Sequence, residues 1–176
     1  NNYLCTEYKD IMRLHRNLVF ATIDSLFEIF NNDKQASKVL QNTLRRDKRW
    51  GARDRAFIAL TTYDIVRWKR LYAEIAGVKA PYKREGLFRM FAVWATLRGI
   101  RLPDWKQFEG TPTRRIKGKF DELSQIRKYR ESIPDWMDEV GLKELGKKWD
   151  KELAALNQEA EVILRVNTLL TTVDEA

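Results

Sequence analysis

The densest group of potential ligand-binding side chains in this sequence is a basic cluster, RRDKRWGARDR, at residues 45–55. Its candidate ligand-binding residues are Arg45, Arg46, Lys48, Arg49, Trp50, Arg53 and Arg55. The helical pattern breaks at Trp50 and Gly51, so the cluster is predicted to lie between two helices. Such a junction offers flexible cations and free backbone N–H groups, both of which bind phosphates. The cluster therefore predicts contact with a polyanion.

Some residues in and near this cluster have two interpretations. Trp50 either stacks on an unpaired base or packs over the core, and Asp54 can favour the N-terminal dipole of the following helix. Three more cations, Arg67, Lys69 and Arg70, lie at the far end of that helix. They either contact RNA or lay their aliphatic stems over the core. The sequence leaves both choices open.

The positive charge of the chain is concentrated in one segment. The 176 residues carry a formal net charge of +8. Residues 34–84 contain 14 basic and 4 acidic side chains, a net charge of +10, whereas residues 131–176 contain 5 basic and 11 acidic ones, a net charge of −6. A basic segment of this kind is typical of proteins that bind nucleic acid. The change of sign indicates a boundary between two units near residue 131.

The sequence offers little for catalysis or metal binding. Its single cysteine, Cys5, and single histidine, His15, exclude a disulfide framework, a cysteine-built zinc site and any site with two imidazoles. The phosphate-binding motifs GxGxxG and GxxxxGKS/T and the metalloprotease motif HExxH do not occur. Adjacent carboxylates such as Asp138 and Glu139 point to different faces of a helix, which is poor geometry for acid–base catalysis. We predict no catalytic, cofactor-binding or metal-binding residue.

Hydropathy argues against a membrane location. The longest uncharged runs, residues 56–63 and 91–97, are far shorter than the roughly 18 apolar residues of a membrane span, so no membrane partner is expected. Residues 1–11 lack the apolar core of a secretory signal, and Met12 is the expected natural start. Together with the single cysteine, these features favour the cytoplasm.

Hydrophobic periodicity predicts an all-α chain. Helices are expected at residues 14–30, 36–44, 52–77 with a bend near Arg67, 84–98, 120–130, from 134 onward, and 149–160. Residues 100–118 contain two prolines and two glycines and are predicted to form a long loop. Residues 162–170, VILRVNTLL, favour a single β-strand. We expect a helical domain over residues 12–130, followed by linker helices and the start of another domain over 131–176.

Four segments of the sequence carry a resemblance to a known family. They are LHRNLVFATIDSL, RDKRWGARDRAFIALTTYDIVRWKRL, SIPDW and ILRVNTLLTT, in this order. The chain resembles the N-terminal portion of the Sun/Fmu-type RNA cytosine-C5 methyltransferases, whose front end is a NusB-like helical RNA-binding domain. RDRAFIALTTYDIVRW and RVNT are the most specific segments, and the resemblance covers residues 12–172. Leu170 departs from the family pattern, in which a lysine is common at this position.

The resemblance implies a NusB-like bundle, then further helices and the first strand of a methyltransferase module. The parent enzyme would transfer a methyl group from S-adenosylmethionine to C5 of a cytosine, in ribosomal RNA, through a covalent cysteine–base adduct. Its catalytic cysteines and cofactor motif belong to a C-terminal methyltransferase domain that would be a partner of this chain, and Cys5 matches neither cysteine. Arg165 and Asn167 of the RVNT segment become further candidate RNA contacts.

Two other functions stay open. The basic face could dock onto an acidic protein surface or onto the acidic residues 131–176 of its own chain, because NusB-like domains engage proteins as well as RNA. The chain could also be a separate antitermination-type factor. The RVNT segment argues against the last function, since it has no role in a lone helical domain.

Overall fold

A computed structural model describes residues 14–158, 165–167 and 170–172, and all regular structure in these ranges is helical. The elements are α1 Arg16–Asn31, α2 Ala36–Leu44, α3 Ala52–Arg67, α4 Lys69–Ala76, α5 Arg84–Leu97, the 3-10 segment η1 Lys106–Phe108, α6 Thr113–Leu123, α7 Arg127–Arg130, α8 Asp135–Leu145, the 3-10 segment η2 Gly146–Lys148, and α9 Trp149–Leu156. An all-α chain is thus confirmed over the described ranges. None of their helices has the length and apolar character needed to cross a bilayer.

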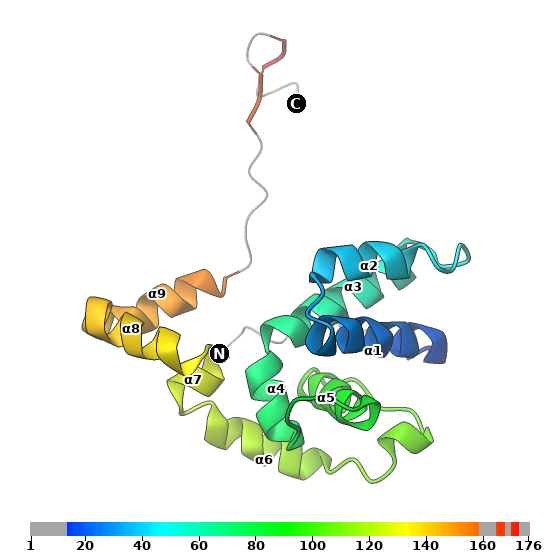
Figure 1. Ribbon diagram of the computed structural model, residues 1–176, viewed down its shortest axis with the longest axis horizontal. Helices are drawn as coiled ribbons and strands as arrows, with labels where there is room; N and C mark the ends of the chain where they lie inside the picture. Colours follow the sequence, from blue (N-terminus) through cyan, green and yellow to red (C-terminus); the bar gives the residue numbers. More distant parts are fainter. Residues whose placement is uncertain (1–13, 159–164, 168–169, 173–176) are drawn as a thin grey trace.

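Helices α1 to α6 pack around one hydrophobic core (Figure 1). Helix α1 contacts α2, α3 and α5, while α4 contacts α5 and α6. The centre of the core is α5, on which Leu87, Met90, Phe91 and Trp94 are fully buried. A helix that is apolar on nearly every side must be enclosed by others, which explains why the bundle forms around α5.

A partly buried polar contact joins three helices of this bundle. The Asp64 carboxylate of α3 forms an ion pair with Arg98, just after α5, and accepts a hydrogen bond of 2.7 Å from Trp94 Nε1. Arg98 Nη1 donates to the Tyr72 hydroxyl of α4 at 3.0 Å. Burial raises the pKa of Asp64, while the guanidinium of Arg98 opposes this shift. Satisfying this partly buried carboxylate therefore fixes α3, α4 and α5 relative to one another.

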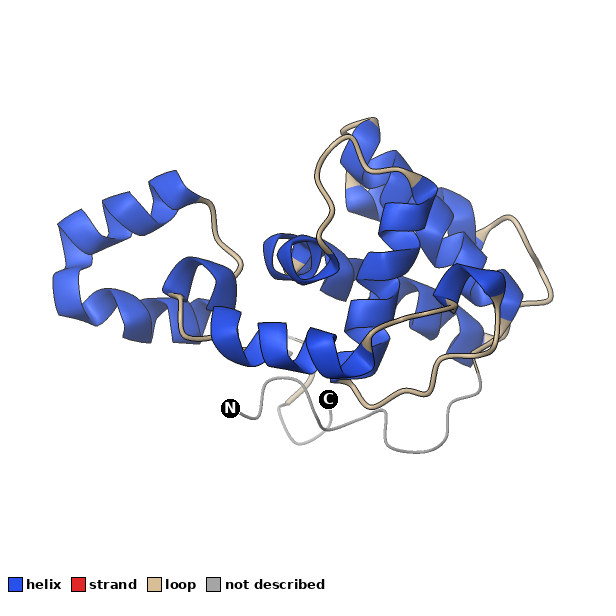
Figure 2. Cartoon of the chain, turned by 90° about the horizontal axis from the view of Figure 1, so that it is seen from below, coloured by secondary structure: helices blue, strands red, loops and turns tan. Residues whose placement is uncertain are grey.

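Helices α7, α8 and α9 form a smaller unit, the helical arm, at residues 127–157. Figures 1 and 2 both show α8 and α9 standing apart from the bundle. The chain reaches them from the bundle through α6 and then α7. The arm has its own core, in which Ile133, Trp149 and Leu153 are buried and Met137 packs against them. Gly141 of α8 makes this core possible, because a Cβ there would collide with the Trp149 indole. The packing of the Trp149 indole against the bare backbone at Gly141 therefore holds α9 against α8.

The prediction of a loop over residues 100–118 is wrong in its second half. Phe108 ends η1 and is buried in the main core, and α6 begins at Thr113, directly after Pro112. Proline suits a helix start because it has no N–H to leave unpaired. The expected helix over 120–130 is also wrong, since α6 ends at Leu123 and α7 is a separate short helix. Ser124 Oγ donates to the Phe120 carbonyl at 2.6 Å where α6 ends.

Other predicted elements agree with the structure. The helices expected at 36–44 and 84–98 are α2 and α5, and the bend expected near Arg67 is the division between α3 and α4 at Trp68. The expected strand at 162–170 falls partly outside the described residues. Its described members, residues 165–167 and 170, have no strand conformation.

We predict that Gly141→Ala selectively destabilises the arm. The new methyl group overlaps the Trp149 ring, and such overpacking costs about 1–3 kcal/mol. Amide hydrogen exchange should show faster opening of α8 and α9, with α1 to α5 unchanged. Gly118→Ala on α6 is the matched control, because a Cβ there meets nothing within 4 Å and alanine favours a helix. Equal exchange behaviour of the two variants would contradict the proposed packing.

Candidate nucleic-acid interface

Most of the basic cluster lies at the surface between α2 and α3. Arg45, Arg46, Lys48, Arg49 and Arg53 are all exposed. Apart from Arg49, these side chains form no hydrogen bond or ion pair with any part of the chain that the structure describes. We call Arg45, Arg46, Lys48 and Arg53 the junction cations. Their charges are available to an external anion.

The first turn of α3 adds main-chain donors to this surface. Gly51 is the N-cap of α3 and has no side chain to cap the helix, and its own N–H donates to Asp54 Oδ2 at 3.1 Å. Asp54 therefore stabilises the start of the helix, as one interpretation of the sequence held. The junction combines a helix N-terminus with the junction cations, an arrangement that suits phosphate groups.

Arg49 is exposed but paired. Its Nη2 lies 2.8 Å from Asp47 Oδ2 and its Nε donates to Asp47 Oδ1 at 3.0 Å. The hydrogen bonds from Arg49 lower the pKa of Asp47 to about 2, and the same pairing raises the pKa of Arg49. Asp47 competes with an external phosphate for Arg49, so this arginine contributes less to anion binding than its exposure indicates.

Arg55 serves the fold of the junction. Its Nη1 donates to the Leu44 carbonyl at 2.6 Å and its Nε donates to the Trp50 carbonyl at 3.0 Å. Leu44 is the last residue of α2, where carbonyl groups lack partners within the helix. Arg55 thereby ties the end of α2 and the connecting turn to α3.

The structure places Trp50 in the core, so it does not supply the RNA contact for which it was a candidate. The side chain is 8% exposed and belongs to the main buried cluster, together with Leu40 and Phe57. Of the two interpretations of the sequence, packing holds, because an indole gains more from burial in this cluster than from exposure to water. No base could stack on Trp50 in this conformation.

Sequence reasoning missed an exposed aromatic side chain on α3. Tyr63 is 47% exposed on α3 and Leu60 is 53% exposed. Both follow Arg53 at helical spacing on the outer face of α3, opposite buried residues such as Ile58. Arg53 and Tyr63 are ten residues apart, or about 15 Å along the helix. The signal available in the sequence was that Tyr63 falls outside the inward-facing period.

The second group of cations contacts the protein itself. Arg67 Nη2 donates to the Glu131 carbonyl at 3.1 Å and also bonds to the Asn157 side chain. Burial lowers the pKa of Arg67, which the Glu131 carboxylate opposes. The ammonium of Lys69 lies 4.6 Å from the Phe30 ring centre and 5.3 Å from that of Tyr82. The structure thus gives Arg67 and Lys69 internal partners.

Arg70 has the largest set of internal contacts in this group. Its Nη1 donates to the Ile133 carbonyl at 2.5 Å and its Nη2 forms an ion pair of 2.8 Å with Asp135. Its guanidinium lies 4.9 Å from the Tyr129 ring centre. Hydrogen bonds from Lys128 and then Arg70 lower the pKa of Asp135. Arg70 therefore joins α4 to the arm.

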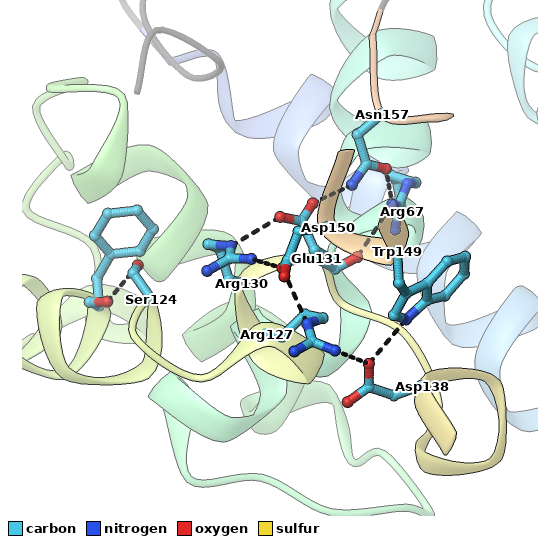
Figure 3. A network of polar contacts seen from close by, with 10 residues as sticks. Arg67, Ser124, Arg127, Arg130, Glu131, Asp138, Trp149, Asp150 and Asn157 are labelled. Atoms are coloured by element: carbon cyan, nitrogen blue, oxygen red, sulfur yellow. Dashed lines mark hydrogen bonds and ion pairs between the residues drawn. The ribbon is translucent and has the colours of Figure 1, made fainter. Parts of the chain in front are cut away.

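Figure 3 shows the polar network that continues from this joint through the arm. Glu131 is buried and accepts hydrogen bonds from Arg130 Nε at 2.8 Å and Asn157 Nδ2 at 2.6 Å. The bond to Glu131 raises the pKa of Arg130. Asp150 Oδ1 accepts from Arg130 and Arg127 at 2.8 and 3.0 Å. This network explains the position of the arm and occupies the charges of Arg127, Arg130, Glu131 and Asp150.

The last two candidate RNA contacts lie near the C-terminal end of the chain. Arg165 and Asn167 are exposed and have no regular secondary structure. Figure 1 shows their segment well away from the α2–α3 junction. The structure therefore does not bring them together with the junction cations.

The described residues contain no group of three or more His, Cys, Asp or Glu side chains that could hold a metal ion. No family model matches the chain, and no curated protein or solved structure matches it. The resemblance to Sun/Fmu-type methyltransferases therefore stays a prediction from sequence. The geometry by itself points to a surface that binds anions.

We predict that Arg70→Ala loosens the arm from the bundle. The variant loses two charge-assisted hydrogen bonds, which together contribute about 1–3 kcal/mol. Small-angle scattering should give a larger radius of gyration, and hydrogen exchange should speed up in α7 but not in α5. Lys147→Ala, which removes an exposed charge from the arm, is the control. An unchanged radius of gyration in Arg70→Ala would contradict the role given to this arginine.

We predict that Arg49→Ala returns the pKa of Asp47 from about 2 toward its usual value near 3.8. Carboxylate chemical shifts in an NMR titration measure this directly. Because the pKa of Asp47 is lower in the folded state, the pair stabilises the protein above about pH 4 and loses this effect as the pH falls toward 2. Arg46→Ala serves as the control. A pKa of Asp47 that Arg49→Ala leaves near 2 would refute the pairing.

Proposed function

We propose that this chain is an RNA-binding region that orients RNA for an S-adenosylmethionine-dependent cytosine-C5 methyltransferase. The single observation that carries the RNA-binding part is the set of junction cations, four exposed charges beside the start of α3 that form no hydrogen bond or ion pair with a described residue. The methyltransferase part is supported by the resemblance of the sequence to the Sun/Fmu-type enzymes.

Under this proposal, the bundle corresponds to a NusB-like domain and residues 162–170 to the segment that leads into the methyltransferase module. The substrate is ribosomal RNA, and the enzyme works in the cytoplasm. S-adenosylmethionine and the catalytic cysteines belong to a methyltransferase domain outside this chain. Arg165 and Asn167 would contact RNA close to that domain, whereas the junction cations would hold a more distant part of the same RNA.

The chemistry of the junction favours the RNA backbone as the first group recognised. Arginine and lysine side chains neutralise phosphates and release condensed counterions, which stabilises the complex without reading the base sequence. Tyr63 adds an exposed ring on the same helix as Arg53, and an unpaired base can stack on such a ring. The combination favours single-stranded RNA or a loop over a regular duplex.

For the part of the basic segment around Arg70, one observation favours docking onto the acidic residues of the same chain. Arg70 pairs with Asp135 of the acidic C-terminal region, so this part of the basic surface docks onto the chain itself. The junction cations have no such partner among the described residues. We therefore limit the proposed RNA surface to the junction and the outer face of α3, and a protein partner for the junction becomes an outcome of the test below.

We predict that replacing the four junction cations with alanine removes most of the salt dependence of RNA binding. Four phosphate contacts to a single strand correspond to a slope of about −3 in log affinity against log salt. The slope should approach zero in the quadruple variant. Fluorescence anisotropy with a labelled single-stranded RNA measures it between about 50 and 300 mM salt, a range that spans physiological ionic strength.

The control removes the same charge elsewhere, through alanine at Lys143, Lys147, Lys148 and Lys151, all exposed on the arm. This variant should keep the slope of the unaltered protein. Tyr63→Ala should lower the affinity and leave the slope unchanged, because it removes a stacking surface and no charge. Equal slopes in the two quadruple variants would refute the junction as the RNA surface, and binding of an acidic protein in place of RNA would favour the alternative.

A further inference from the structure

A recess on the side of the bundle opposite α2 has the features of a second anion site. It lies between the end of α4, α5, the segment after η1 and the first turns of α6, and its volume is about 370 Å³. Its apolar floor includes Ala92, Val93 and Ile116. Figure 1 shows α6 and α2 on opposite sides of the bundle. The recess is therefore separate from the junction cations.

Three cations surround this recess. Arg89 comes from α5, while Arg115 and Lys119 lie one turn apart on α6. Arg89 and Arg115 form no hydrogen bond or ion pair with a described residue, and Lys119 Nζ has only a long hydrogen bond of 3.4 Å to the Glu74 carbonyl. Glu109 is the one carboxylate that lines the recess. The excess of positive charge favours a doubly charged anion such as a phosphate monoester.

The sequence of α6 also indicates a charged ligand. The first turn of α6 contains Arg115, which lines the recess, and no acidic residue. Cations at the start of a helix are unfavourable because they face the positive end of the helix dipole. A bound anion would offset this cost. The recess, and not the helix start alone, gives the anion a place.

An uncharged group in the recess points to the rest of the ligand. Gln107 lines the recess, and its Oε1 is buried without a hydrogen-bond partner among the described residues. Buried acceptors without a partner are rare because each loses its hydrogen bonds to water. Rotation of the Gln107 amide would present this oxygen to a ligand hydroxyl in the recess. The phosphate group of a doubly ionised phosphate monoester has no hydrogen to donate, so the donor is a hydroxyl elsewhere on the ligand.

We propose that this recess binds a sugar phosphate, with the phosphate between Arg89, Arg115 and Lys119 and a sugar hydroxyl donating to Gln107. Its volume is at the lower end of the range of about 300–1,000 Å³ for small-molecule sites, so one sugar phosphate fits and a dinucleotide does not. The ligand is either a free sugar phosphate or the phosphorylated ribose at the end of an RNA strand. This inference does not rest on RNA binding at the α2–α3 junction.

The test is calorimetric titration of the full chain with ribose 5-phosphate and, separately, inorganic phosphate. Ribose 5-phosphate should bind more tightly than phosphate. Arg115→Ala and Lys119→Ala should each weaken both ligands about tenfold, since each loses a charge-assisted contact. Arg114→Ala, adjacent on α6 but outside the lining of the recess, is the matched control and should change the affinity less than about twofold, the ordinary range for a surface substitution.

Gln107→Leu separates the two parts of the proposal. It should remove the advantage of ribose 5-phosphate over phosphate and leave phosphate binding intact. Equal affinity of the unaltered protein for both ligands would overturn the role of Gln107. No saturable binding, or equal losses in Arg114→Ala and Arg115→Ala, would overturn the site. Circular dichroism of each variant shows whether it folds, and Arg115→Lys should recover part of the affinity.

Two further measurements distinguish the source of the ligand and keep this inference apart from the proposed function. If a short RNA with a 5′-phosphate displaces ribose 5-phosphate, the ligand is an RNA end. If the RNA does not displace it, the ligand is a free sugar phosphate. The variant without the junction cations should bind ribose 5-phosphate as the unaltered protein does. Failure of RNA binding at the junction would therefore leave the proposed sugar phosphate site standing. Failure of sugar phosphate binding in the recess would likewise leave the proposed RNA surface standing.

Discussion

The arrangement of the bundle depends on one partly buried carboxylate. Asp64 lies between helices with its charge satisfied, and it obtains partners where Arg98 and Trp94 of the α5 region meet α3, with Tyr72 of α4 bound to the same arginine. Removing one partner leaves a partly buried polar group without its hydrogen bond, which costs about 1–3 kcal/mol. This constraint sets the orientation of α3, and α3 carries the junction at one end and the joint to the arm at the other.

The fold gives the arginines of one basic segment three different roles. Arg45 and Arg53 face solvent, Arg55 holds the end of α2, and Arg70 connects α4 to the arm. The difference lies in what each guanidinium can reach, because an arginine beside unpaired carbonyl groups satisfies them before it meets a ligand. The charge density of a segment therefore overstates the number of its residues that can bind RNA.

Local patterns predicted much of the fold, and long-range contacts explain what they missed. The period of 3.6 residues located α1, α2 and α5 and the bend at Arg67. It failed for α6, where Arg114, Arg115 and the interior Gly118 hide a helix that is stabilised by burial of Ile116. The burial of Trp50 and the open recess beside Gln107 depend on helices distant in sequence. No periodicity within one segment records such contacts.

The joint between the bundle and the arm has a consequence for sequence change. Arg67 and Arg70 bind the main-chain oxygens of Glu131 and Ile133, and every amino acid supplies such an oxygen. Substitutions at residues 131 and 133 can therefore alter the chemistry of this region and still keep these two bonds. The position of the arm relative to α3 then depends on where the main-chain oxygens lie and not on the side chains at these positions. Homologous chains could therefore share this position while their surfaces diverge.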